Sequence, residues 1–188
     1  MPNYCSYSMC VKGTRENVNE FIKVIQAGYD YGSMEFDYDR HLFRVFEAYY
    51  ETIEDLGHGL SQVIINGNCA WSVSSCMLDD HPTGYYNTLK QRYPNEFRGT
   101  TLQIESQNLN LGIEVFSEES GMCFQEHYVI INGNITVNEC VDYNEYYLDE
   151  YETKEEAEKD LDIEITDEEW EEHEFISRGG FDNWDFEI

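Results

Sequence analysis

The alternation of apolar and polar residues at the start of the chain predicts a strand followed by a helix. Residues Tyr4 to Lys12 alternate and end at Gly13, which is typical of a half-buried strand. Thr14 can cap a helix that ends at Gly28 and whose apolar residues recur at helical spacing, namely Val18, Phe21, Ile22 and Ile25. A strand followed by a helix opens a split β-α-β unit, so we expect an α+β fold.

A polar and aromatic stretch, residues 29–41, is typical of a loop, and the apolar run Leu42–Tyr50 after it predicts a strand. An Asn-Gly pair then indicates a β-hairpin, because both residue types tolerate the positive φ of a tight turn. This pair, Asn66-Gly67, lies between Gln62–Ile65 and Cys69–Met77. We therefore expect two paired strands here.

A second Asn-Gly pair, Asn132-Gly133, separates Cys123–Ile131 from Ile135–Val141 and predicts a second hairpin. The six residues Val63–Asn68 recur unchanged as Val129–Asn134. Two explanations stay open: the chain contains duplicated half-domains, or two hairpins have converged on the same sequence.

The middle of the chain predicts a short helix over Tyr85–Tyr93 that ends at Pro94. The runs Thr101–Glu105 and Leu109–Phe116 predict two more strands. Together these elements predict a ferredoxin-like antiparallel sheet with helices on one face, formed by residues 1–141.

Two sequences near the C-terminus match the Ser/Thr-x-x-Glu capping box, in which a hydroxyl and a glutamate satisfy free backbone N–H groups. They start at Thr153 and Thr166, and they predict short helices near residues 154–161 and 167–174. Trp170 in the second helix is expected to anchor this segment to the body.

Charge is concentrated in the last quarter of the chain. The 188 residues carry 39 Asp+Glu and 11 Lys+Arg, a formal net charge of −28, and residues 142–188 hold 20 of these acidic and 3 of these basic residues. We therefore expect a body, 1–141, and an acidic segment, 142–188, packed on it. The final Phe181–Ile188 alternates and predicts an amphipathic strand.

This acidity argues against direct binding to nucleic acid or anionic lipid, which requires clustered Lys and Arg. It favours binding to a basic partner, binding to a cation, or a role in solubility alone. The N-terminus has no secretory signal peptide and no apolar run spans a membrane, so we expect a cytoplasmic protein with reduced cysteines. Cys5, Cys69 and Cys76 are then expected to be buried as small hydrophobic residues.

Phosphate-binding loops, dinucleotide-binding turns and His-Glu-x-x-His are absent from the sequence. Gly57–Ser61 superficially resembles a hydrolase elbow, but a turn is the simpler interpretation. Cys123, His127 and Cys140 form the best reactive set: they could supply an activated thiolate, contribute to a metal site, or simply pack on two strands. We expect a non-enzymatic protein without a cofactor or metal.

The opening Met1–Cys5, followed by a strand, Gly13 and an amphipathic helix, resembles the YubB-type ferredoxin-like family of phage- and plasmid-encoded proteins. The segments Cys69–Ser72 and Gly121–Glu126 are also similar to that family. The resemblance extends through about residue 143. It implies an α+β fold and an origin in a mobile element, and it assigns no catalytic residues.

The acidic segment is the basis of the functional hypothesis. Solubility alone needs a net charge of only about 2–8 in magnitude, and the excess of repelling carboxylates calls for another explanation. We infer a nucleic-acid mimic that blocks a basic host-defence protein. Because the resemblance implies a mobile element, one such class is anti-CRISPR proteins, which act on the positively charged channel of a Cas nuclease.

Three alternatives stay open: a solvated acidic surface with no specific role, a small hydrolase, and a cation-binding protein. The predicted partner-binding residues are Tyr147, Glu150, Tyr151, Glu152, Glu155, Glu156, Glu158, Asp160, Asp162, Glu164, Asp167, Glu168, Glu169, Glu171 and Glu172.

Overall fold

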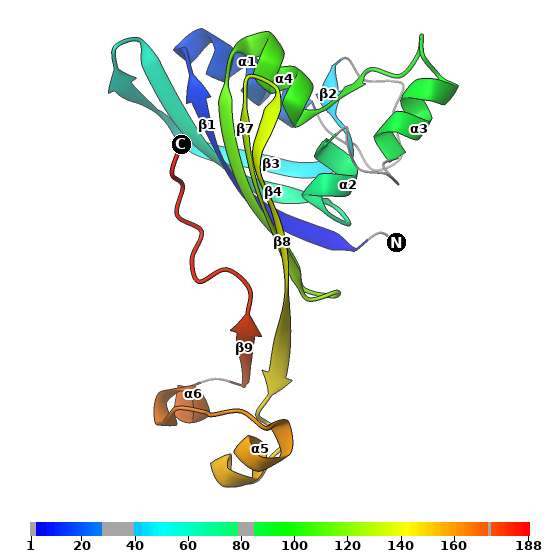
Figure 1. Ribbon diagram of the computed structural model, residues 1–188. Helices are drawn as coiled ribbons and strands as arrows, with labels where there is room; N and C mark the ends of the chain where they lie inside the picture. The colour runs from blue at the N-terminus through cyan, green and yellow to red at the C-terminus, as the bar shows by residue number, and fades with distance from the viewer. Residues whose placement is uncertain (1–2, 28–39, 79–84, 173) are drawn as a thin grey trace.

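The protein has an α+β fold built on one large antiparallel sheet (Figure 1). The computed structural model describes residues 3–27, 40–78, 85–172 and 174–188. The strands of the sheet are β1 (Tyr4–Gly13), β3 (Val45–Gly57), β4 (Leu60–Ala70), β6 (Gly112–Glu119), β7 (Phe124–Ile131), β8 (Asn134–Tyr147) and β9 (Phe175–Gly179). Their spatial order is β3-β4-β1-β6-β7-β8-β9.

The helices described are α1 (Arg15–Gln26), α2 (Val73–Met77), α3 (Tyr85–Arg92), α4 (Leu102–Leu109), α5 (Lys154–Leu161) and α6 (Asp167–Glu172). Two short parallel strands, β2 (His41–Leu42) and β5 (Gly99–Thr100), form a second sheet. Helix α1 packs against β3 and β4, and α4 packs against β6 and β7. The main core lies between these helices and the sheet. None of the helices described is both long and apolar enough to cross a membrane.

The predicted opening strand and helix are confirmed. Thr14 caps α1, because its hydroxyl accepts a hydrogen bond from the Asn17 backbone N–H at 3.3 Å. The four apolar side chains predicted to face the core, Val18, Phe21, Ile22 and Ile25, are all buried. The predicted stop at Gly28 and most of the predicted loop over 29–41 lie outside the described residues. The predicted helix after residue 84 is confirmed as α3.

The predicted hairpin at Asn66-Gly67 is wrong, because both residues lie inside β4. The chain turns instead at residues 57–59, between β3 and β4. A bulge in β3 brings the carbonyl of Glu47 over Gly67, where a Cβ atom would lie only 1.9 Å from that oxygen and 2.6 Å from the Tyr7 hydroxyl. Glycine is therefore required here for close approach of the backbones rather than for a turn.

The same six residues do form a hairpin in their second copy. Asn132 and Gly133 have φ of 49° and 83° and connect β7 to β8, as predicted. One hexapeptide thus has two conformations in one chain. The surrounding strands, and not the local sequence, decide which one it adopts.

Four other predicted strands differ from the structure. Cys69–Met77 continues β4 only to Ala70 and then forms α2. Thr101–Glu105 belongs to α4, whose first turn is capped by the Thr101 hydroxyl. The strand expected over Leu42–Tyr50 is interrupted at Phe43 and Arg44, because Arg44 has a left-handed φ of 52°. The strand expected from Leu109 begins only at Gly112, after the left-handed Asn110.

Strands β8 and β9 form a ribbon that carries α5 and α6 away from the body, as Figure 1 shows. We call residues 143–179 the C-terminal lobe. Residue 142, the expected boundary between body and acidic segment, lies inside β8, so one strand is shared by the body and the lobe. The lobe is therefore joined to the body by continuous β-structure.

The chain returns from the lobe to the body along the face of the sheet opposite α1 and α4 (Figure 1). Residues 181–188 do not form the predicted strand. Their aromatic side chains nevertheless pack on the sheet: Phe181, Trp184 and Phe186 surround the ring of Phe116 at centroid distances of 5.7–5.9 Å. The Glu187 and Ile188 backbone N–H groups donate to Glu114 at 2.6 and 3.1 Å.

Candidate functional site: the acidic C-terminal lobe

The two helices of the lobe begin at the predicted capping residues. The Thr153 hydroxyl accepts a hydrogen bond from the Glu156 N–H at 3.3 Å, and the Thr166 hydroxyl accepts one from the Glu169 N–H at 3.1 Å. The Glu169 carboxylate also accepts from the Thr166 N–H at 2.8 Å. The second helix therefore has the complete reciprocal capping box.

The lobe has a small hydrophobic core of its own. Its buried residues are Leu148, Ala157, Ile165 and Ile176, and the partly buried Tyr146, Tyr151, Leu161, Ile163 and Trp170 pack against them. Trp170 was expected to anchor the segment to the body, and this expectation is wrong. Its ring belongs to the separate core of the lobe, because α6 folds back on α5 and the ribbon rather than on the main sheet.

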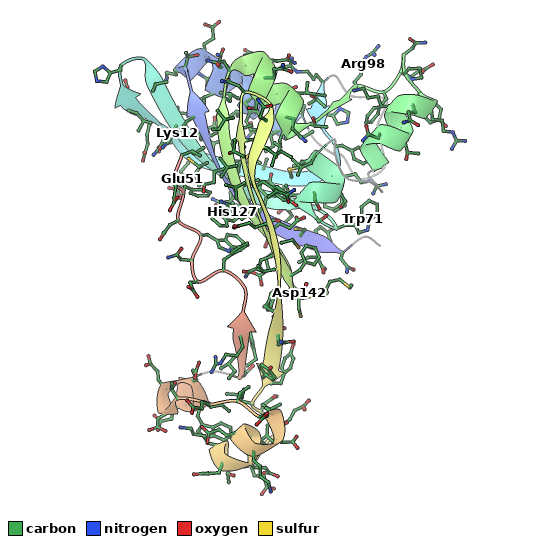
Figure 2. All side chains as sticks on the ribbon, in the orientation of Figure 1. Lys12, Glu51, Trp71, Arg98, His127 and Asp142 are labelled. Carbon is green, nitrogen blue, oxygen red and sulfur yellow. The ribbon has the colours of Figure 1, made fainter. Side chains whose placement is uncertain are left out.

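Most of the predicted partner-binding carboxylates project into solvent, as the sticks of Figure 2 illustrate for the lobe. The exposed acidic residues between 149 and 174 are Asp149, Glu150, Glu152, Glu155, Glu156, Asp160, Asp162, Glu164, Asp167, Glu168, Glu171 and Glu174. The side chain of Glu172 lies outside the described residues. The lobe therefore displays its charge on a folded scaffold.

Two predicted partner-binding carboxylates, Glu158 and Glu169, are only partly exposed and hold the lobe together. Glu158 accepts a hydrogen bond from the Ile165 N–H at 3.0 Å, which closes the connection between the two helices. Glu169 caps α6 and also binds both terminal nitrogens of Arg178, at 2.8 and 3.0 Å. The hydrogen bonds from Arg178 and Thr166 lower the pKa of Glu169 to about 2.

A second ion pair joins the two helices of the lobe and connects Lys154 of α5 to Asp167 of α6 at 2.7 Å. This contact raises the pKa of Lys154 and lowers the pKa of Asp167.

Of the two predicted partner-binding tyrosines, Tyr147 is exposed. The half-buried Tyr151 instead donates a hydrogen bond from its hydroxyl to the Asp160 carboxylate at 3.0 Å. Tyr151 therefore stabilises the lobe, and Tyr147 is available to a partner.

The charge density of α6 can be compared with that of nucleic acid. Its six residues include five carboxylates, and at 1.5 Å per residue they extend over about 9 Å. Lys154 and Arg178 compensate Asp167 and Glu169. The remaining three charges give one per roughly 3 Å, close to the ~3.4 Å between phosphates along one DNA strand. The charge density of α6 is thus close to that of single-stranded DNA rather than of a DNA duplex.

The structure does not bring Cys123, His127 and Cys140 together as a reactive set. Both ring nitrogens of His127 face carboxylates, Glu114 at 2.9 Å and Glu139 at 3.4 Å. The Cys123 thiol donates to the Ser120 carbonyl. Partial burial and nearby carboxylates, among them that of Glu145, raise the pKa of the Cys123 thiol, which opposes formation of a nucleophilic thiolate.

His127 and its neighbours instead hold the end of the chain. The ring of His127 stacks on that of Phe116 at 4.1 Å, below the returning C-terminal segment. Cys140 is exposed as a residue, and partial desolvation of its thiol together with the Glu126 carboxylate raises the pKa of this thiol. Within the described part of the chain, no three His, Cys, Asp or Glu side chains lie close enough to hold a metal ion. Cys5, Cys69 and Cys76 are buried as free thiols, as predicted.

Sequence reasoning missed the burial of several carboxylates in the body. Glu105, Glu114, Glu119 and Glu126 are at most 2% exposed. Glu126 accepts hydrogen bonds from the Val73 N–H at 2.8 Å and the Ser117 hydroxyl at 2.9 Å, and it thereby ties α2 to the sheet. The period of two in β7 could have revealed this burial, because Glu126 shares a face with Tyr128 and Ile130.

A small cavity lies on the opposite part of the molecule, between β3 and β4. Its volume is about 250 Å³, and Tyr49, Glu54, Gln62 and Ile64 are among its lining residues. The Glu54 carboxylate is already bound by the Gln62 amide at 2.7 Å. The cavity is smaller than the roughly 300–1,000 Å³ of most small-molecule sites, so it gives little support to the hydrolase alternative.

Comparison with family models, with curated proteins and with solved structures finds no match for this chain. The residues of the lobe therefore carry the functional argument by themselves.

Proposed function

We propose that this protein is a non-enzymatic inhibitor whose C-terminal lobe mimics a nucleic-acid strand and occupies the basic groove of a nucleic-acid-binding protein. The observation that supports it is the display of exposed carboxylates on a scaffold with its own core and two capped helices. A preformed anionic surface can displace counterions from a basic groove without first being ordered, which favours binding.

The position of the lobe adds support. Figure 1 shows that the lobe projects from the body at the end of the β8–β9 ribbon. A concave partner can therefore enclose the lobe with little obstruction by the body. The lobe holds only three Lys or Arg residues, and two of these, Lys154 and Arg178, form ion pairs inside it. Their charges therefore do not repel a basic partner from the outer surface.

We further propose that the body is ferredoxin-like and of mobile-element origin. The order β3-β4-β1-β6 supports this, because α1 connects β1 to β3 with β4 between them, and α4 precedes β6, which pairs with β1. This is the strand order of a split β-α-β repeat. On this proposal the protein acts in the bacterial cytoplasm as a phage anti-defence protein, and a Cas nuclease is the first partner to test.

The test is competition with DNA. A labelled DNA duplex is bound to a guide-loaded Cas nuclease, and this protein is titrated in at 50 and at 200 mM salt. We expect displacement of the DNA, and we expect the apparent affinity to fall by about tenfold to a hundredfold between the two salt concentrations. No displacement from this nuclease, and none from a panel of other basic nucleases, would contradict the proposal.

A matched pair of triple variants separates a specific surface from general acidity. Glu155→Lys, Glu168→Lys and Glu171→Lys change the lobe, and Glu16→Lys, Glu51→Lys and Glu96→Lys change the body by the same net charge. These are exposed side chains. At roughly 0.5 kcal/mol for each substitution, the lobe variant should lose about tenfold in affinity. Equal losses in both variants would indicate an unspecific acidic surface.

A further inference from the structure

The ribbon that carries the lobe has one covered face and one bare face. Tyr146 and Ile176 are cross-strand partners, and they pack into the core of the lobe. The adjacent pair, Tyr147 and Phe175, points the other way and is 53% and 49% exposed. Their ring centroids lie 6.0 Å apart, with the planes inclined by 41°.

Exposed aromatic pairs of this kind are unusual in an otherwise strongly charged surface. Each ring leaves apolar area in water that a partner could cover, and large exposed apolar groups are informative for this reason. Single exposed hydrophobic residues need no explanation, but two contiguous rings on a narrow ribbon form one apolar platform. Aromatic residues are also enriched among those that contribute most to binding energy in interfaces.

Acidic groups border this aromatic pair. Glu145 lies two residues before Tyr147 on the same face of β8, and its carboxylate accepts the Tyr147 hydroxyl at 3.4 Å. The exposed Glu174 directly precedes Phe175. Arg178, the cation of this ribbon, is held by Glu169 and the Glu164 carbonyl. The bare face therefore combines two aromatic rings with carboxylates that form no ion pair with the residues the structure describes.

We propose that Tyr147, Phe175 and Glu145 form the recognition site for an arginine side chain of the partner protein. The planar guanidinium stacks on the rings and donates to the Glu145 carboxylate. Arginine fits better than lysine, because an ammonium group cannot stack and is more strongly hydrated. This inference rests on the proposed function: the carboxylates of the helices attract the basic groove, and the aromatic pair selects arginine within it.

The experiment compares two fluorescent nonapeptides, nona-arginine and nona-lysine, which carry the same charge. Fluorescence anisotropy gives their affinities for the full-length protein and for Tyr147→Thr/Phe175→Thr. Threonine retains β-propensity, and hydrogen exchange of the α5 amides reports whether the lobe stays folded. We expect the ratio of nona-arginine to nona-lysine affinity to fall by about fivefold in the variant, with nona-lysine affinity unchanged.

Tyr49→Thr/Tyr50→Thr is the matched control, because it removes two exposed tyrosines from β3 in the body. It should leave the ratio at its wild-type value. An unchanged ratio in the lobe variant would overturn the arginine site and leave the proposed function standing. Failure of both peptides to bind the wild-type protein would instead contradict the proposed function itself. If the α5 amides of the lobe variant lose their protection from hydrogen exchange, Glu145→Gln replaces this variant, and the same fall in the affinity ratio is required.

Discussion

The small core of the lobe predicts that the lobe unfolds independently of the body. Ile165 is only 3% exposed and lies among Leu148, Ala157 and Ile176. Ile165→Ala removes three carbon atoms, which costs about 2.4 kcal/mol at ~0.8 kcal/mol each. The cavity left behind adds a further cost, so we expect a loss of roughly 2.5–4 kcal/mol from the stability of the lobe.

This loss is large for so small a unit. The three large aliphatic side chains of this core, Leu148, Ile165 and Ile176, contribute together roughly 5–9 kcal/mol before the entropy of ordering the chain is subtracted. Removing a third or more of this contribution should open the lobe in a substantial fraction of molecules. The main core, which includes Ile130 and Val115, does not touch this site and should stay intact.

Native-state hydrogen exchange is the measurement. In Ile165→Ala, the amides of α5 should exchange about a hundredfold faster, since ~1.4 kcal/mol corresponds to a factor of ten. The amides of β1 should keep their rates. Ile130→Ala, the same change in the body, should accelerate β1 instead. Equal acceleration of α5 and β1 in the first variant would refute the independence of the lobe, and no acceleration of α5 would refute the role of Ile165.

Three other predictions concern single residues. Because the folded pKa of Glu169 is lowered to about 2 from an ordinary 4.5, its contribution to lobe stability is present above pH 4.5 and is lost as the pH falls toward 2. Glu169→Gln should therefore reduce the loss of lobe stability over this pH range, measured by hydrogen exchange of the α5 amides after correction for the intrinsic exchange rate. Gly67→Ala should destabilise the body by more than about 3 kcal/mol, because its Cβ would overlap the Glu47 carbonyl; a thermal midpoint within 5 °C of wild type would contradict the packing described. The raised pKa of Cys123 predicts slow alkylation at pH 7.5 in the native protein and fast alkylation in urea, followed by mass spectrometry.

Elements that depend on neighbouring residues were predictable from the sequence. The capping boxes at Thr153 and Thr166 determine where both lobe helices begin, and their hydrogen bonds form within one turn. The first strand and helix follow from a continuous periodicity over more than twenty residues. In each case the information lies within a short window of the chain.

Elements that depend on distant residues were not predictable. Asn66-Gly67 has a strong local preference for a turn, but Gly67 is paired with Tyr7 on one side and Ala48 on the other. No local pattern indicates that a bulge earlier in the chain, at Glu47 in β3, brings a carbonyl into the space above Gly67. Thr101–Glu105 shows the same limit, because its two alternating apolar residues fit a strand and the first turn of a helix equally well.

Composition identifies the acidic segment, but it does not show which carboxylates are engaged inside the lobe. The sequence does not distinguish the carboxylates of Glu158 and Glu169, which hold the lobe together, from exposed ones such as Glu155 and Glu168. The difference arises because backbone N–H groups and Arg178 approach from segments outside the same helix. Phe175 was overlooked because its pairing with Tyr147 exists only after the ribbon forms.

The pairing of Tyr143 with Gly179 at the base of the ribbon determines how the lobe should be removed in genetic experiments. A stop codon near residue 142 would also delete Phe181 and Trp184 and would strip the aromatic cover from Phe116. An internal excision that joins the two strands near this pair by a two-residue Asn-Gly turn would shorten the ribbon and keep the cover in place. If this internal deletion abolishes a phenotype, the loss can be attributed to the carboxylates of the lobe. After a stop codon near residue 142, the same loss could also result from exposure of the face of the sheet around Phe116.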